Sequence, residues 1–447
     1  MATFITVLQF FAGLSLLIVL HELGHFLAAK YFGVRVEKFY LFFDFLFPMP
    51  EVAKFSLYKK KIGDTEYGIG WFPFGGYVQM SGIMDENMDK EALKEPVQDY
   101  EFRAKPAWQR LIILLGGIIV NVLVAFVIYA MIAGIWGDSY VKVQDQPYGI
   151  YVDSTGAALG LQNGDFVTHV DGKKIDDVKK VKLEMIFNLA ENITYLRNGE
   201  EGQIAGISKE FYKSVIDDPS IVLFETASLP IIDSVTSVVL AKNGVQSGDR
   251  IVSFEGEAIE FHQDLLQLKK GRANEIVQFE VERAGEILSL STQLDEQAAM
   301  GFFAKSDLPI THITYNFFEA LVAGPVKTWD ALMFYVRQFK LMFDPVVKGY
   351  RQIGGFGTIA KLYSGGFSWY AFLTKTAFLS IILAFMNLLP IPALDGGHAV
   401  FTIYEMIFRK PPPEKFMYYA QLVGMALLFG LLIYANGNDI FRWLSGK

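Results

Sequence analysis

Four long runs of apolar residues stand out from an otherwise mixed sequence, at residues 4–29, 111–135, 371–392 and 416–435. Each run reaches the roughly 20 residues that a helix needs to cross the hydrocarbon core of a bilayer. The pattern predicts four transmembrane helices, with helices buried in a large soluble core as the alternative. The first run is too long for a cleaved signal peptide and no Lys or Arg precedes it, so we expect it to be retained.

The loop after the first run holds two apolar and aromatic stretches, VRVEKFYLFF at residues 34–43 and YGIGWFPFGGYVQM at residues 67–80. Their pattern predicts amphipathic β-strands that are apolar enough to dip into the membrane. An edge strand in this loop could pair with an extended peptide. Ordinary packing of the loop is the alternative.

An internal repeat follows the second run. Residues 160–175 read GLQNGDFVTHVDGKKI, and residues 244–259 read GVQSGDRIVSFEGEAI. Each copy has a Gly-Asp turn, a short β run and a second turn with Gly, which predicts two copies of one small β-rich domain. Both resemble the GDxIxxxxG stretch of PDZ domains, which bind extended peptides at a sheet edge. Modules that only fill space are the alternative.

The stretch from the repeat to the third run mixes apolar residues with Lys327, Arg337 and Lys340 in a helical rhythm that breaks at Gly324-Pro325. This pattern predicts a pair of amphipathic helices at the membrane interface. Packing against the neighbouring soluble domain is the alternative.

Composition agrees with a mixture of membrane spans and soluble domains. Hydrophobic residues make up 52% and charged residues 20% of the chain, and its net charge of −8 gives no reason to expect nucleic-acid binding. With no Cys, disulfides and thiolate metal ligands are excluded, so a metal site would need His, Asp or Glu.

Lys and Arg predict the orientation. They gather at both ends of the first loop, within 30–38 and 103–110, and in the short link at 409–415. By the positive-inside rule these loops are cytoplasmic, and the long segment 137–370 lies outside. A plasma membrane, the inner membrane of a bacterium, is the expected location.

The sequence HELGH ends the first run and places His21 and His25 four residues apart, with Glu22 beside them. Side chains at i and i+4 project from one helix face, so both imidazoles could bind one zinc ion while the Glu acts as a general base. A polar clamp between helices is the structural alternative.

A catalytic zinc needs a third protein ligand and an open position for water. The other histidines within the repeat or just after it are predicted to lie outside the membrane. The segment NLLPIPALDGGH, residues 387–398, lies at the cytoplasmic end of the third run, as HELGH does in the first. Its prolines break the helix and Gly396-Gly397 permits close backbone approach. By chemistry alone, Asp395 and His398 are both candidates.

These features together resemble the site-2 protease family of intramembrane zinc metalloproteases, above all its bacterial branch of regulator-of-sigma-E proteases with tandem PDZ domains. The resemblance spans nearly the whole chain and implies that His21, His25 and Asp395 bind zinc. It makes Glu22 the general base and Asn387 a residue that hydrogen-bonds the substrate. His398 then has a structural or supporting role.

One position departs from the family pattern, which usually has Gly-Pro-x-x-Asn in the second span. This chain reads Gly-Ile-Ile-Val-Asn at 117–121, so the Asn is present and the Pro is not. The helix shape there is therefore in question.

The resemblance predicts an endopeptidase that cuts transmembrane segments of single-pass proteins, such as an anti-sigma factor, within the lipid bilayer. Alternatives are an idle membrane scaffold that binds peptides through its PDZ pair, and an anchored protease that acts on soluble substrates. The expected organisation is polytopic and α-helical, with the β-rich insertions outside the membrane. Its parts are residues 1–137, PDZ domains at 143–226 and 227–305, an interfacial segment at 306–369, and the last two spans at 370–447.

Overall fold

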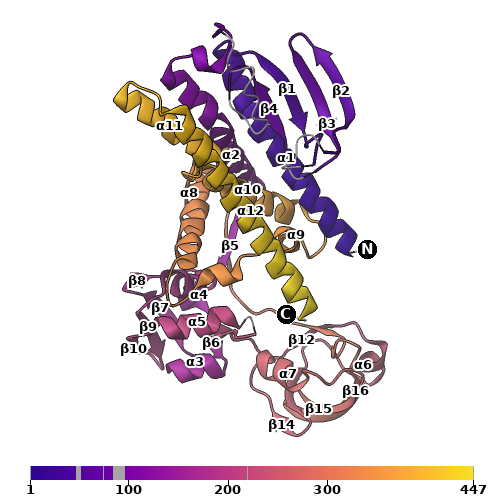
Figure 1. Ribbon diagram of the computed structural model, residues 1–447. Helices are drawn as coiled ribbons and strands as arrows, with labels where there is room; N and C mark the ends of the chain where they lie inside the picture. Colours follow the sequence, from indigo (N-terminus) through magenta and orange to yellow (C-terminus); the bar gives the residue numbers. More distant parts are fainter. Residues whose placement is uncertain (1, 47–51, 74, 84–95, 219, 446–447) are drawn as a thin grey trace. The chain divides into compact units, whose positions relative to one another are not determined.

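The computed structural model describes residues 2–46, 52–73, 75–83, 96–218 and 220–445. The chain folds into two compact units (Figure 1). The first comprises Met1–Gly137, Thr314–Phe339 and Tyr350–Lys447, and the second comprises Asp138–Ile313 and Lys340–Gly349.

Among the described residues, four helices of the first unit are long and apolar enough to cross a membrane. They are α1 (Ala2–Tyr31), α2 (Ala107–Trp136), α10 (Trp369–Leu388) and α12 (Glu414–Leu444). The prediction of four spans is confirmed in length and composition. The third helix is shorter than expected, because Pro390 and Pro392 cannot continue a helix and the residue before each is driven out of the helical region.

Helix α2 is the central helix of this unit, in contact with α1, α10 and α11 (Asp395–Phe408). Its buried residues include Ile113, Ile118 and Asn121. The helix is continuous through Ile118, so the absence of the family's Pro leaves a regular helix there.

The first loop forms a four-stranded sheet in the order β2-β3-β1-β4. The strands are β1 (Val36–Leu41), β2 (Ser56–Ile62), β3 (Thr65–Gly70) and β4 (Tyr77–Met80). Strands β1 and β3 are parallel, whereas β4 is antiparallel to β1 and forms one edge. The first predicted strand is present as β1, whereas the second stretch, 67–80, is divided between the end of β3 and β4. Strand β2 was not expected, and Phe74 lies outside the described residues. Both β1 and β4 contact α1 (Figure 1).

Two further helices complete the first unit, α8 (Phe317–Met342, whose last turn belongs to the second unit) and α9 (Phe356–Leu362). The expected break at Gly324-Pro325 is wrong, since α8 continues through Pro325. Pro325 cannot donate to the carbonyl of Leu321 four residues earlier, and the helix continues without that bond. In the following turn, Thr328 Oγ1 donates to the carbonyl of Gly324 at 2.8 Å. The rings of Tyr335 and Phe339 lie 5.4 and 5.2 Å from Phe385 of α10. This part of α8 therefore packs on the helix bundle.

The second unit contains two four-stranded sheets whose strand orders correspond when both are read from the same edge, β10-β9-β7-β8 and β16-β15-β13-β14. The first is built from β7 (Phe166–Val170), β8 (Lys173–Lys174), β9 (Asn192–Arg197) and β10 (Glu200–Ala205). The second is built from β13 (Arg250–Phe254), β14 (Glu257–Ala258), β15 (Ile276–Arg283) and β16 (Glu286–Gln293). The sequence repeat therefore corresponds to a structural repeat.

Smaller elements surround these sheets. Two-stranded sheets pair β6 (Ile150–Val152) with β11 (Phe224–Thr226), β12 (Ile232–Val235) with β17 (Phe302–Ala304), and β5 (Asp138–Val141) with β18 (Ile310–Ile313). The helices are α3 (Ser154–Leu159), α4 (Val178–Asn188), α5 (Lys209–Asp217), α6 (Val238–Lys242) and α7 (His262–Leu268). The assignment of the two copies to PDZ domains, and their boundaries, stay predictions.

Candidate metal centre

Helix α1 positions two imidazoles for one ion. His21 and His25 lie one turn apart, and their Nε2 atoms are 3.2 Å from each other. Nδ1 of His25 lies 2.8 Å from the main-chain oxygen of Ile113 in α2. Because a carbonyl oxygen can only accept, Nδ1 carries the proton and Nε2 keeps its lone pair for a metal.

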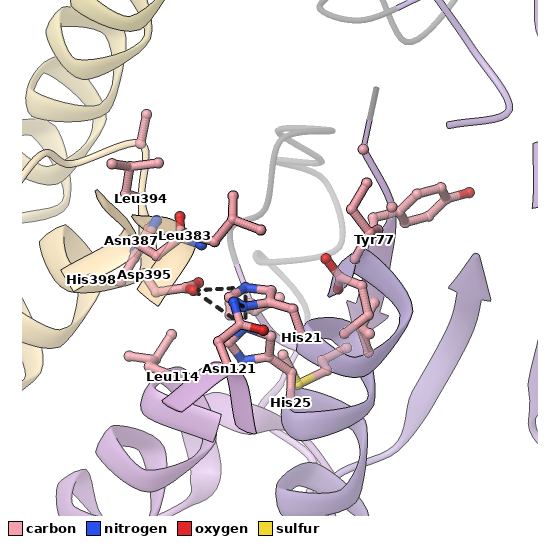
Figure 2. A pocket seen from close by; sticks show the side chains of 18 of the residues that line it. His21, His25, Tyr77, Leu114, Asn121, Leu383, Asn387, Leu394, Asp395 and His398 are labelled. Carbon is pink, nitrogen blue, oxygen red and sulfur yellow. Dashed lines mark hydrogen bonds and ion pairs between the residues drawn. The ribbon is translucent and has the colours of Figure 1, made fainter. Parts of the chain in front are cut away.

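Helix α11 supplies a carboxylate to the same point. Asp395 is its first residue, where the positive end of the helix dipole favours a negative charge. Its Oδ2 lies 3.2 Å from Nε2 of His21 and 3.3 Å from Nε2 of His25 (Figure 2). The sequence places these residues about 370 positions apart, and the fold brings them together.

These three atoms fit a zinc ion. Zinc binds nitrogen and carboxylate oxygen at about 2.0–2.2 Å in tetrahedral geometry, which separates neighbouring ligands by about 3.2–3.6 Å. The distances of 3.2, 3.2 and 3.3 Å match this spacing. Asp395 Oδ2 is also buried without a hydrogen-bond partner among the described residues. A buried carboxylate oxygen in that position is suited to a cation.

Glycines allow the helices to approach this point. A Cβ on Gly117 of α2 would lie 2.5 Å from Nε2 of His25 and from Cε1 of His21. On α11, a Cβ on Gly396 would lie 2.4 Å from the carbonyl oxygen of Leu388, and one on Gly397 would lie 2.3 Å from that of Ile391. The close approach expected of Gly396-Gly397 is therefore present.

The three ligand candidates line a cavity of about 380 Å³. The other lining residues come from α1, the first sheet and α2 (Ile18, Glu22, Phe45, Gly75, Gly76, Tyr77, Val78, Met80, Ile83, Leu114, Asn121) and from α10 to α12 (Leu383, Asn387, Ala393, Leu394, His398, Gln421). Every sequence-predicted site residue is thus in one cavity. Figure 2 shows Asn387 on the same side as Asp395, with the two histidines facing them.

His398 lies one turn beyond Asp395 and also lines the cavity. Among the described residues, the group of ligand atoms within 4.8 Å of one another contains His21, His25 and Asp395 and does not contain His398. The geometry therefore favours the carboxylate as the third ligand.

The cavity has an edge strand in its wall. Residues Gly75 to Val78 and Met80, in and just before β4, line it together with Asp395. A Cβ on Gly76 would lie 2.9 Å from Cγ2 of Ile18 and 3.4 Å from Cγ of Glu22. The glycine thus lets the chain entering β4 lie directly against the catalytic face of α1.

A bundle of membrane helices around a zinc-type ligand set and an HExxH glutamate defines a membrane-embedded metallopeptidase. Comparison with known families agrees, because residues 9–431 match Peptidase family M50. The chain belongs to this family, the site-2 proteases, and is a zinc-dependent metalloendopeptidase.

Its relatives cover nearly the full chain. It is 28% identical to the regulator of sigma-E protease RseP of Escherichia coli K12, over 97% of this chain and 98% of that protein. The same identity and shares hold for RseP of Salmonella typhimurium 14028s. A Vibrio cholerae protein that carries the name zinc metalloprotease is also 28% identical, again over 97% and 98%.

Sequence reasoning noted Gly117 and Asn121 only as parts of the Gly-Pro-x-x-Asn pattern, and it foresaw neither their contacts with the histidines nor the role of Gly76. Gly76 had no such signal, because a close approach between distant segments leaves no local pattern. The contact of Asn121 could have been expected, since an amide in a transmembrane run is a polar residue that needs a partner.

Proposed function

We propose that this chain is an intramembrane endopeptidase that cleaves transmembrane segments of single-pass membrane proteins, with its zinc held by His21, His25 and Asp395. The observation that carries the proposal is the convergence of these three ligand atoms, 3.2–3.3 Å apart, in a cavity among helices long enough to span a bilayer. A peptide bond that reaches this cavity comes from a segment within the membrane.

When bound, the zinc polarises the scissile carbonyl and makes water acidic enough to be deprotonated near neutral pH. Glu22 follows His21 directly and lines the same cavity. It would take the proton from the attacking water and return it to the nitrogen of the leaving amine. General acid–base catalysis of this kind contributes roughly 10²–10⁴-fold to the rate.

Asn387, in the last turn of α10, would donate from its amide to the substrate backbone or to the oxygen that becomes negative in the tetrahedral intermediate. Figure 2 places it beside Asp395 and facing the cavity, which supports this role.

A substrate helix must be unwound first, because its own hydrogen bonds hide the peptide bond. Strand β4 pairs with β1 on one side and stands at the edge of its sheet. An extended substrate could add to this edge in the cavity wall, since the edge offers unpaired backbone groups.

The substrate class and setting follow from the same proposal. RseP proteins are named as regulators of sigma-E, so a membrane-bound anti-sigma factor is a candidate substrate here. We place the protein in a bacterial inner membrane, with the active site toward the cytoplasm and the repeat domains outside. The repeat domains, if they act as PDZ domains, would bind extended peptides.

The test is cleavage of a single-pass substrate, reconstituted in liposomes, by wild type and by Glu22→Gln. We expect wild type to cut within the transmembrane segment and Glu22→Gln to lose about 10²–10⁴-fold in rate while keeping its zinc. Equal cleavage by both would contradict the mechanism. Zinc binding without cleavage of any membrane segment would point to a scaffold.

A further inference from the structure

We propose that Asn121 is the positioning residue for His21: its side-chain oxygen accepts the proton of His21 Nδ1 and so holds Nε2 toward the metal. The inference rests on the proposed ligand set. It assigns to α2 the task of orienting both histidines of α1.

His25 provides the pattern, because its Nδ1 donates to the carbonyl oxygen of Ile113 at 2.8 Å. An imidazole that binds a metal through Nε2 must carry its proton on Nδ1, and that proton needs an acceptor. His21 offers Nε2 to the same point, 3.2 Å from Asp395 Oδ2, so it has the same requirement.

The side chain of Asn121 answers this requirement. Its amide group lies 3.1 Å from Nδ1 of His21, with Nδ2 facing the ring. Asn121 Oδ1 is buried and has no hydrogen-bond partner among the described residues. If Nδ2 donated to the ring, the proton would sit on Nε2 and block the metal. A half-turn of the amide puts Oδ1 in its place, where it accepts from Nδ1–H.

The backbone around Asn121 is anchored well enough for such a role. The residue is 0% exposed, and its main-chain oxygen accepts a bond of 2.7 Å from Ser380 Oγ in α10. Figure 2 shows its side chain beside the two imidazoles. A buried amide within a transmembrane helix is costly unless it has a specific partner, and the ring of His21 is the partner within reach.

The test compares the purified full-length variants Asn121→Asp, Asn121→Ala and Asn121→Leu with wild type. Zinc affinity is measured by competition with a chelator, and the ligand geometry by the absorption spectrum of the Co²⁺-substituted protein. We expect Ala and Leu to bind zinc about 10–100-fold more weakly and to alter the Co²⁺ spectrum. Asp keeps an acceptor oxygen and should stay close to wild type.

Thr376→Val is the matched control, because it removes another buried polar contact of the bundle, with Tyr363 at 3.2 Å, and should leave zinc affinity unchanged. If Ala and Leu bind zinc as wild type does, or if Asp loses as much affinity as Leu, the proposal is wrong. His21→Ala tests the proposed zinc ligands separately from the role of Asn121. If that variant keeps full zinc affinity, His21 is not a ligand and the proposed ligand set is wrong, whatever the Asn121 variants do.

Discussion

Gly24 of α1 and Gly116 of α2 lie backbone against backbone. A Cβ on Gly24 would be 2.3 Å from the carbonyl oxygen of Gly116, and a Cβ on Gly116 would be 2.6 Å from that of Gly24. Glycines at a contact between two helices leave no side chain between the backbones, so the helices can approach closely within a membrane. It brings the histidines of α1 within reach of the main-chain oxygen of Ile113 and the side-chain amide of Asn121 in α2.

The next glycine along α2 yields the first prediction. Gly117→Ala should lower zinc affinity by at least about 10-fold, since the added methyl group would displace the imidazoles from their tetrahedral positions. Chelator competition on the purified protein measures this. Gly430→Ala on α12, whose Cβ would meet nothing within 4 Å, is the control and should bind zinc normally. Normal zinc binding by Gly117→Ala would argue against this site.

The third ligand is tested by Asp395→Ala and His398→Ala. We expect wild type to hold about one zinc per chain and Asp395→Ala to lose affinity by roughly 100-fold, because one of three protein ligands is gone. His398→Ala should keep its zinc. Metal analysis after dialysis against a weak chelator separates the two variants. The reverse result would make His398 the ligand.

The approach of the chain before β4 to α1 is tested by Gly76→Val. A side chain there would push this segment away from Ile18 and Glu22, and a displacement of about 1 Å can cost roughly 10²-fold in rate. We expect kcat/KM to fall by about 10-fold or more with zinc content unchanged. Ile62→Ala, on β2 at the opposite edge of the sheet, should be nearly normal. Unchanged activity in Gly76→Val would show that the position of β4 does not matter.

The repeat predicts how the second unit responds to acid. Asp249 is buried, and Arg283 donates to both of its carboxylate oxygens at 2.6 and 2.7 Å. The first copy has the same pair, Arg197 with Asp165, at 2.7 and 2.8 Å. Burial raises the pKa of Asp249, but the bonds from Arg283 and the N–H of Gln246 outweigh it and hold the pKa below its ordinary value.

A lowered native pKa means that the ionised carboxylate stabilises the fold above the unfolded pKa, about 3.9, and that this contribution is lost as the pH falls through the native pKa. Asp249→Asn should therefore unfold at lower urea concentration at pH 7, and its stability should depend less on pH below 4. Hydrogen exchange of the backbone amides of β13 and β15, measured in the full chain, reports both the stability at pH 7 and its dependence on pH. Glu257→Gln, exposed on β14, is the control. Equal pH dependence in Asp249→Asn and wild type would contradict the prediction.

Orientation can be tested because the chain has no Cys of its own. Single cysteines at the exposed positions Lys173 and Lys410 should react differently with a membrane-impermeant maleimide in intact spheroplasts. From the Lys and Arg bias, we expect labelling at residue 173 and none at residue 410 until the membrane is opened. The opposite pattern would invert the proposed orientation.

Much of the active centre can be predicted from the sequence because it depends on local periodicity. HELGH sets two imidazoles and a carboxylate on neighbouring positions of one helix, whatever surrounds it. The four spans follow from run length, and the repeat follows from matching Gly-Asp turns. The end of α10 is a partial success, since prolines mark where a helix stops but the exact last residue depends on packing.

Other features depended on the tertiary structure. Asp395 and His398 are equal candidates by chemistry, and only the start of α11 at Asp395 places that carboxylate, and not the imidazole one turn later, within 3.3 Å of both histidines. The acceptor for His25 is a main-chain oxygen, which every residue has and no side-chain pattern can reveal. Contacts between segments about 100 to 370 residues apart are decided by how helices pack, because a sequence pattern records which face of a helix is apolar but not which helix covers it.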